Sequence, residues 1–126
     1  MVHSLDFTFG GLNLGNLYSR LGDPDAAEFG FRSALDVDPA FVPAMSNLAV
    51  LLNGQGRNDE AEALLRRALD LEPDLPDLSY SLGLLLAEMG RFTEAEPYLA
   101  RAVAAMPGHP RAAHNLEQVR ARLRSR

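Results

Sequence analysis

Residues 13–18 read NLGNLY, and related stretches return every 34 residues, as NLAVLL (47–52), SLGLLL (81–86) and NLEQVR (115–120). A period of about 20 to 50 residues is typical of an array of repeated supersecondary units rather than of a single globular core. The alignment needs no gap and divides the chain into three full units and one partial unit: residues 8–41, 42–75, 76–109 and 110–126.

Certain positions within each unit carry only small residues. The eighth position is Gly15, Ala49 and Gly83, and alanine fills the twentieth (Ala27, Ala61, Ala95) and twenty-seventh (Ala34, Ala68, Ala102) positions. Small residues at fixed spacing allow two helices to approach closely, while larger apolar residues fill the space between them. We therefore expect paired helices with the leucines of the seventh position buried: Leu14, Leu48, Leu82 and Leu116.

Helix boundaries are marked by glycine, acidic or threonine residues, and proline. Glycine at the fifteenth position suits the left-handed residue that ends a helix (Gly22, Gly56, Gly90). A capping-box pattern follows and predicts the start of a second helix (Asp25 with Glu28, Asp59 with Glu62, Thr93 with Glu96). Proline then ends that helix (Pro39, Pro73, Pro107). Residues 110–126 are expected to form a capping helix with one apolar face (Ala112, Leu116, Val119, Leu123).

The run Leu14-Gly15-x-x-Tyr18, followed by Ala27-x-x-x-Phe31 and Pro39, resembles the tetratricopeptide repeat, which has the same period. The resemblance covers residues 8–126. It implies an all-α, right-handed superhelical solenoid of antiparallel helix-turn-helix units, preceded by an N-terminal extension (residues 1–7). One departure concerns the fourth position, where the family usually has a large aromatic residue. Because this chain has Gly11, Met45, Ser79 and Ala113 there, we expect looser packing at that position.

No arrangement of residues typical of catalysis is found. The chain has no cysteine, which excludes disulfides and thiolate metal sites. His109 and His114 are five residues apart, whereas ligands on one helical face are three or four apart. There is no nucleophile-elbow motif and no glycine-rich phosphate loop. We therefore expect a protein that is not an enzyme and needs no cofactor.

Charge and hydropathy narrow the classes of partner. Residues 1–109 carry 16 acidic residues and seven arginines, whereas residues 110–126 carry five arginines and Glu117. An acidic body disfavours nucleic acid. Neither a secretion signal nor a stretch of roughly 18 apolar residues is found, so we expect a cytoplasmic protein with no membrane partner.

The resemblance also implies a binding face, because the first helices of such arrays line a concave groove that holds a segment of a partner protein. Asparagine or serine recurs there at the sixth position, and asparagine again at the ninth position of the first unit. An amide side chain offers both a donor and an acceptor, the complement of a peptide group. The predicted peptide-binding residues are Asn13, Asn16, Asn47, Val50, Tyr80, Ser81, Leu84 and Asn115.

This pattern resembles the asparagine ladder in the repeat superhelix of O-linked N-acetylglucosamine transferase, although Ser81 interrupts it. The alternative is that the amides face water or bond to the neighbouring helix. The carboxylate clamp of co-chaperone arrays is disfavoured, because its basic positions are occupied by Leu12, Asp77 and Ser81.

The function expected is a protein-interaction module that binds a peptide segment in this groove. Two alternatives remain. One is a scaffold that forms homo-oligomers through an uncapped N-terminal repeat, and the other is the substrate-selecting fragment of a larger protein.

Overall fold

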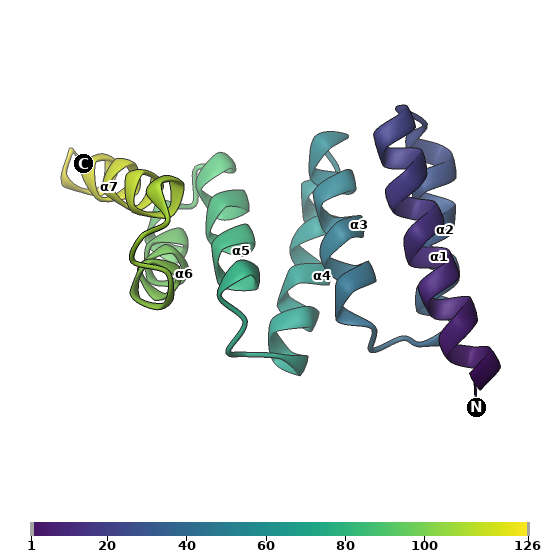
Figure 1. Cartoon of the computed structure of the whole chain (residues 1–126). Coiled ribbons are helices and arrows are strands. Elements are labelled where there is room, and N and C mark those ends of the chain that lie inside the picture. The colour runs from purple at the N-terminus through teal and green to yellow at the C-terminus, as the bar shows by residue number, and fades with distance from the viewer. Residues whose placement is uncertain (1, 126) are drawn as a thin grey trace. The chain divides into compact units, whose positions relative to one another are not determined.

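The computed structural model describes residues 2–125, with side chains from Phe7 to Ser125, and in that range it contains seven α-helices and no strand (Figure 1). The helices are α1 (Val2–Leu21), α2 (Pro24–Val37), α3 (Val42–Gly54), α4 (Asn58–Leu71), α5 (Pro76–Glu88), α6 (Phe92–Ala105) and α7 (Pro110–Arg124). The predicted all-α class is confirmed. Of the predicted N-terminal extension, residue 1 lies outside the described residues, and residues 2–7 form the first turns of α1.

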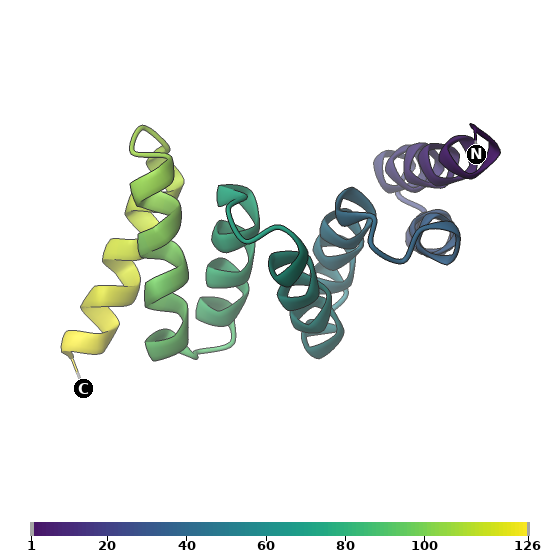
Figure 2. The ribbon, with the colours of Figure 1, turned by 90° about the horizontal axis from the view of Figure 1, so that it is seen from below.

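The helices form two compact blocks, an N-terminal block (residues 1–71) and a C-terminal block (residues 72–126). In the N-terminal block, α1 and α2 form one antiparallel pair and α3 and α4 a second, and α2 packs against α3 (Figures 1 and 2). In the C-terminal block, α5 and α6 form a pair and α7 packs against α6. Each pair is a helix, a short turn and a second helix, as the sequence predicts.

The small residues lie where the paired helices meet. Ala27, Ala61 and Ala95 are completely buried. A Cβ atom added to Gly83 would lie 2.8 Å from Cγ of Leu99, and one added to Gly30 would lie 2.6 Å from the backbone nitrogen of Gly15. Neither position leaves room for a larger side chain. The prediction that small residues allow close helix approach is confirmed.

The expectation of looser packing at the fourth position is wrong in the N-terminal block. There α1 and α2 have closed around Gly11, since an added Cβ would lie 2.7 Å from the carbonyl oxygen of Gly30. Met45 fills the same position of α3 and is completely buried. Ser79, in the C-terminal block, is also buried but borders a hollow.

The expected burial of the seventh-position leucines fails at Leu14. Leu48, Leu82 and Leu116 are buried, but the side chain of Leu14 is 48% exposed, as are large parts of Leu17 and Leu21 on the same helix. No described helix covers the side of α1 that carries these three leucines. By contrast, α3 packs against α2, and α7 packs against α6. The leucine pattern therefore continues onto a free apolar face.

The turns lie where the sequence predicts them, whereas the second helices begin earlier than predicted. Gly22, Gly56 and Gly90 have φ angles of 76°, 75° and 77°, the left-handed conformation predicted for them. The predicted capping boxes are wrong: α2 begins at Pro24, and Asp23 is its N-cap, accepting a hydrogen bond of 3.2 Å from the Ala26 nitrogen. α4 and α6 likewise begin before Asp59 and Thr93. The cause is the shortness of the turn, in which the residue directly after each glycine supplies the first helical carbonyl acceptor.

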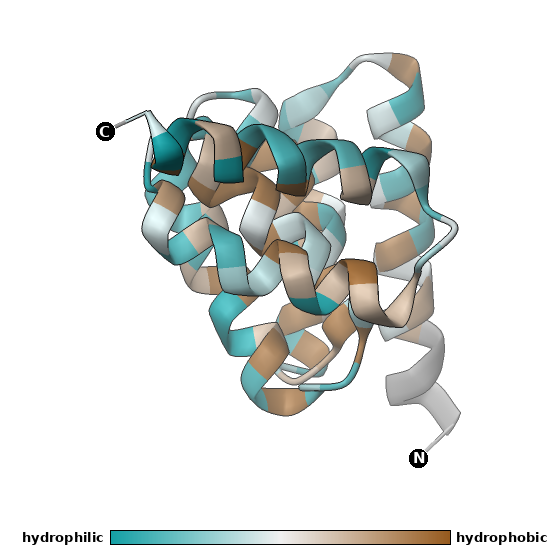
Figure 3. Cartoon of the chain, turned by 90° about the vertical axis from the view of Figure 1, so that its left-hand side faces the viewer, coloured by the Kyte–Doolittle hydropathy of each residue, from teal (hydrophilic) through white to brown (hydrophobic). Residues whose placement is uncertain are grey.

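The C-terminal helix α7 covers one end of its block. Ala112, Leu116 and Val119 are buried on its inner face, and Leu123 is half-buried. Hydrophilic residues dominate its outer side, as Figure 3 shows along the helix that leads to the C-terminus. This arrangement has the features of a cap, because repeat units need a polar outer face at their ends.

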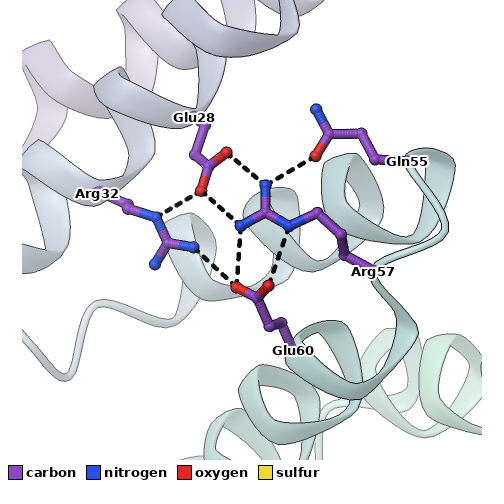
Figure 4. Close-up of polar contacts among 5 residues, drawn as sticks. All are labelled: Glu28, Arg32, Gln55, Arg57 and Glu60. Atoms are coloured by element: carbon purple, nitrogen blue, oxygen red, sulfur yellow. Dashed lines mark hydrogen bonds and ion pairs between the residues drawn. The ribbon is translucent and has the colours of Figure 1, made fainter.

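A cluster of ion pairs links the two helix pairs of the N-terminal block (Figure 4). Glu28, on α2, accepts hydrogen bonds from Nη1 and Nη2 of Arg57 at 2.8 and 3.2 Å. Arg32 donates to the same carboxylate at 2.7 Å, and Glu60, on α4, accepts from Arg57 at 3.0 Å. Arg57 lies in the turn between α3 and α4, so the cluster fixes that turn against α2.

The cluster makes part of the stability depend on pH. The hydrogen bond from Arg57 holds the pKa of Glu28 below its ordinary value of 4.5; partial burial acts against this effect, and Arg32 reinforces it. A carboxylate with a lowered pKa in the folded state contributes stability above its unfolded pKa. That contribution is lost as the pH falls through the lowered pKa.

We predict that Glu28→Gln lowers the free energy of unfolding by about 1 kcal/mol at pH 7, because a bidentate arginine contact is lost. The difference from wild type should shrink as the pH falls below about 4.5, which urea unfolding at several pH values would measure. Glu117→Gln is the matched control, since Glu117 pairs with Arg124 where both side chains are 64% exposed. An equal effect of the two substitutions would contradict the role assigned to the cluster.

We also predict that Ala61→Leu destabilises the protein by ~1–3 kcal/mol, because the added atoms have no space between α3 and α4. Ala63→Leu, an exposed position of the same helix, should leave the unfolding midpoint nearly unchanged. Thermal and urea unfolding followed by circular dichroism would compare the two variants. An unchanged midpoint for Ala61→Leu would show that the helices are not closely packed there.

Candidate functional site

Residues of α1 and α3, with Phe31 of α2, line an open hollow of about 280 Å³ in the N-terminal block, here named the N-terminal hollow. It is lined by Asn16, Ser19, Phe31, Asn47, Val50 and Leu51. Three of the predicted peptide-binding residues, Asn16, Asn47 and Val50, thus lie together. Phe31, which reaches the hollow from α2, is buried, whereas Val50 is 63% exposed.

Asn16 and Asn47 bond to each other across the two helices. Nδ2 of Asn47 donates to Oδ1 of Asn16 at 2.8 Å. This contact is the alternative left open by the sequence, in which an amide bonds to the neighbouring helix. It uses only part of each side chain, because an amide has two donor hydrogens and a carbonyl oxygen. The amide hydrogens of Asn16 and the side-chain oxygen of Asn47 remain outside this bond.

A second hollow, of about 510 Å³ and here named the C-terminal hollow, lies between α5 and α7. It is lined by Tyr80, Leu84, Pro110, Arg111, His114 and Asn115. Three further predicted residues, Tyr80, Leu84 and Asn115, therefore lie together in the C-terminal block.

The side chain of Tyr80 is held at both ends. Its hydroxyl oxygen accepts a hydrogen bond of 3.0 Å from Nδ2 of Asn115. Its ring lies 5.1 Å from the imidazole of His109, measured between centroids. His109 is itself fixed, because its Nδ1 accepts a hydrogen bond of 3.0 Å from the Ala112 nitrogen and so caps α7. The face of α5 therefore presents an aromatic ring with a defined orientation.

Asn13 and Ser81 do not line either hollow. Asn13 is exposed on α1, and Ser81 is half-buried on α5. They lie on the same helices as the other predicted residues, and their part in binding stays a prediction.

Sequence reasoning missed several lining residues, of which Arg111 is the most informative. It is the second residue of the partial unit and lies on the same helix as the predicted Asn115. On this helix Asn115 was predicted because asparagine recurs at the sixth position, whereas Arg111 shares no residue type with the second position of the other units. Leu51 was missed because its position was expected to be buried, yet it also reaches the edge of a hollow, and Phe31 lies on the second helix of its pair. Ser19 is on the first helix, but no recurring residue type marked its position.

The two hollows differ in charge. The residues lining the N-terminal hollow are all uncharged, whereas Arg111 brings a permanent positive charge to the C-terminal hollow and no acidic residue lines it. Among the side chains that the structure describes, from Phe7 to Ser125, no group of three His, Cys, Asp or Glu is placed to hold a metal ion. In the same part of the chain no helix is long and apolar enough to cross a membrane.

The sequence matches the family model described as "Tetratricopeptide repeat" twice, over residues 18–85 and 52–123. Together the two matches extend from the end of α1 nearly to the end of α7. A comparison with curated proteins finds no match to the chain.

Several solved structures share the fold. A mutant O-GlcNAc transferase of Thermobaculum terrenum is 27% identical, with a TM-score of 0.84 over 92% of this chain, but only 22% of the transferase chain is covered. YrrB, described as a TPR protein with an unusual peptide-binding site, is 25% identical, with a TM-score of 0.80 over 86% of this chain and 56% of its own. The secretion chaperone SycD of Yersinia enterocolitica, solved with a peptide of the translocator YopD, is 18% identical, with a TM-score of 0.80 over 89% of this chain and 91% of its own.

Proposed function

The chain belongs to the tetratricopeptide repeat family, and we propose that it is a non-catalytic module that binds an extended peptide segment of a partner protein on the outward faces of its first helices. The observation that carries this proposal is the Asn16–Asn47 pair at the N-terminal hollow. The remaining predicted residues are proposed to contact a peptide within their own block, Asn13 on α1 of the N-terminal block and Ser81 on α5 of the C-terminal block.

The amide pair has the chemistry needed to hold a peptide backbone. A peptide group presents one N–H donor and one carbonyl acceptor. The amide hydrogens of Asn16 can donate to the carbonyl, and Oδ1 of Asn47 can accept from the N–H. Because the bond between the two asparagines already restrains both side chains, less conformational entropy is lost when a peptide binds. Each new hydrogen bond would contribute about 0.5–1.5 kcal/mol.

Contacts to the backbone alone do not select a sequence, so side-chain preference must come from other residues. Val50 and Phe31 offer apolar contact in the N-terminal hollow. In the C-terminal hollow, Tyr80 and Leu84 offer an apolar surface beside the positive charge of Arg111. A partner segment that combines apolar and acidic residues fits this second set.

Relatives with the same fold support the proposal. YrrB has a peptide-binding site, and SycD was solved with a bound peptide. Neither identifies the partner of this chain.

A homo-oligomeric scaffold is the second candidate, and the free apolar face of α1 favours it. Leu14, Leu17 and Leu21 expose 48%, 41% and 67% of their surface there. A second copy of the chain could cover this face. The third candidate, a repeat segment of a larger enzyme, is supported by the similarity to a part of the O-GlcNAc transferase chain.

We predict that the double variant Asn16→Ala/Asn47→Ala binds peptides about tenfold or more weakly than wild type, because two backbone contacts of about 1 kcal/mol each are lost. A peptide array would identify ligands of the wild-type protein, and fluorescence anisotropy would then measure their Kd with both proteins. Asn53→Ala is the matched control, since it removes a half-buried amide of α3 that does not line the hollow.

The result expected is a loss of affinity across peptides of different sequence, with the Asn53→Ala control unchanged. Unchanged affinity of the double variant would contradict the assignment of the binding face to α1 and α3. If the array shows no ligand and the mass of the protein rises with concentration, the scaffold is the better account.

A further inference from the structure

One arginine of the C-terminal hollow carries a charge that no neighbouring carboxylate neutralises. Arg111 lines the hollow and is exposed, and among the described residues it forms no ion pair. The other arginines of α7 have partners: carboxylates pair with Arg120 and Arg124, and Arg122 lies over the ring of Phe92. Arg111 is therefore the arginine of α7 whose guanidinium remains available to a ligand.

The wall of the hollow beside Arg111 is apolar and includes a further hydrogen-bond donor. It is formed by Tyr80, Leu84 and Pro110. The hydroxyl oxygen of Tyr80 accepts from Nδ2 of Asn115 at 3.0 Å, so the hydroxyl hydrogen is not used in that bond. A carboxylate offers only acceptors, which an arginine and a hydroxyl donor can satisfy. The hollow thus combines a site for a carboxylate with a surface for an apolar side chain.

Two acidic residues of α5 limit the negative charge that a ligand can carry. Asp77 lies one turn before Tyr80 and Glu88 one turn after Leu84, and both are exposed but do not line the hollow. Residues three or four positions apart lie on the same side of a helix, so the two carboxylates flank the face that a ligand would cover. They would repel a run of acidic residues, whereas a single acidic residue placed at Arg111 avoids them.

The overall charge of the chain does not favour acidic ligands. Its formal net charge is −5 at pH 7, so the long-range field attracts positively charged partners. A preference for an acidic residue therefore requires a local cause, and Arg111 supplies one in a hollow that no acidic residue lines.

We propose that the C-terminal hollow selects a partner segment in which a single acidic residue, aspartate or glutamate, stands next to an apolar residue. The carboxylate pairs with Arg111 and accepts a hydrogen bond from the hydroxyl of Tyr80, while the apolar side chain packs on the Tyr80 ring and Leu84. Basic segments and runs of acidic residues are rejected. This inference rests on the proposed function and adds to it which residue of the partner is recognised and which segments are excluded.

The test is a selection from a display library of random eight-residue segments, each placed within a loop so that no free chain terminus takes part. Segments that bind the wild-type protein are expected to be enriched in a single acidic residue beside an apolar one, and to be poor in lysine, arginine and acidic pairs. Arg111→Glu should abolish this enrichment. Arg101→Glu, the same change of charge at an exposed position of α6 that does not line the C-terminal hollow, is the control and should preserve it.

The outcomes separate this inference from the proposed function. Selected segments without acidic enrichment, or an enrichment that survives Arg111→Glu, would overturn the inference and leave peptide binding intact. Loss of the enrichment in Arg101→Glu as well would also overturn it, because overall charge would then be the cause. If no segment is selected, the proposed function fails and this inference fails with it.

A synthetic peptide copied from a selected segment then locates the contact. Replacing its acidic residue by the corresponding amide should weaken binding to wild type about fivefold, the size expected for an exposed ion pair, and the difference should shrink as salt is added. With Arg111→Gln the same replacement in the peptide should have no effect on Kd. An equal loss of affinity with both proteins would show that the carboxylate does not contact Arg111.

Discussion

The arrangement of each helix pair depends on the absence of side-chain volume where its two helices cross. A Cβ atom at Gly83 or Gly30 would collide with atoms of the partner helix, and the alanines of the twentieth and twenty-seventh positions are completely buried. Close contact at these points sets the separation of the helices, and the larger leucines on either side then bury apolar surface. This contact uses one face of the first helix in each pair. The opposite face of that helix is therefore not needed to hold the pair together.

The free faces carry different chemistry in the two blocks. In the N-terminal block, Asn16 and Asn47 bond to each other and still present hydrogen-bonding groups beside an uncharged hollow. In the C-terminal block, Tyr80 is held between His109 and Asn115 next to a positively charged Arg111. The first arrangement suits contact with any peptide backbone, and the second suits selected side chains. Each block by itself therefore supports part of the proposed function, the N-terminal block through backbone contacts and the C-terminal block through contacts with side chains.

The sequence predicted the features that depend on local geometry. The turn glycines have the expected positive φ, because a left-handed residue after a helix is a property of a few neighbouring residues. Features that depend on contacts between different helices were harder to predict. Leu14 fits the buried pattern, but its burial requires a helix outside the described pairs. The bond between Asn16 and Asn47 joins residues 31 positions apart, so it depends on helix spacing and side-chain rotamers that periodicity does not specify. The capping boxes were misplaced because the length of the turn decides which carbonyl begins the helix.

The central claim is that the amide groups of Asn16 and Asn47 contact a bound peptide directly. It is tested most directly by NMR, in which the side-chain amide signals of these two residues are followed while a peptide ligand is added. The account predicts that both signals shift and saturate together with the backbone signals of α1 and α3. Saturable shifts confined to α2 and α4, with the two side-chain signals unmoved, would contradict it.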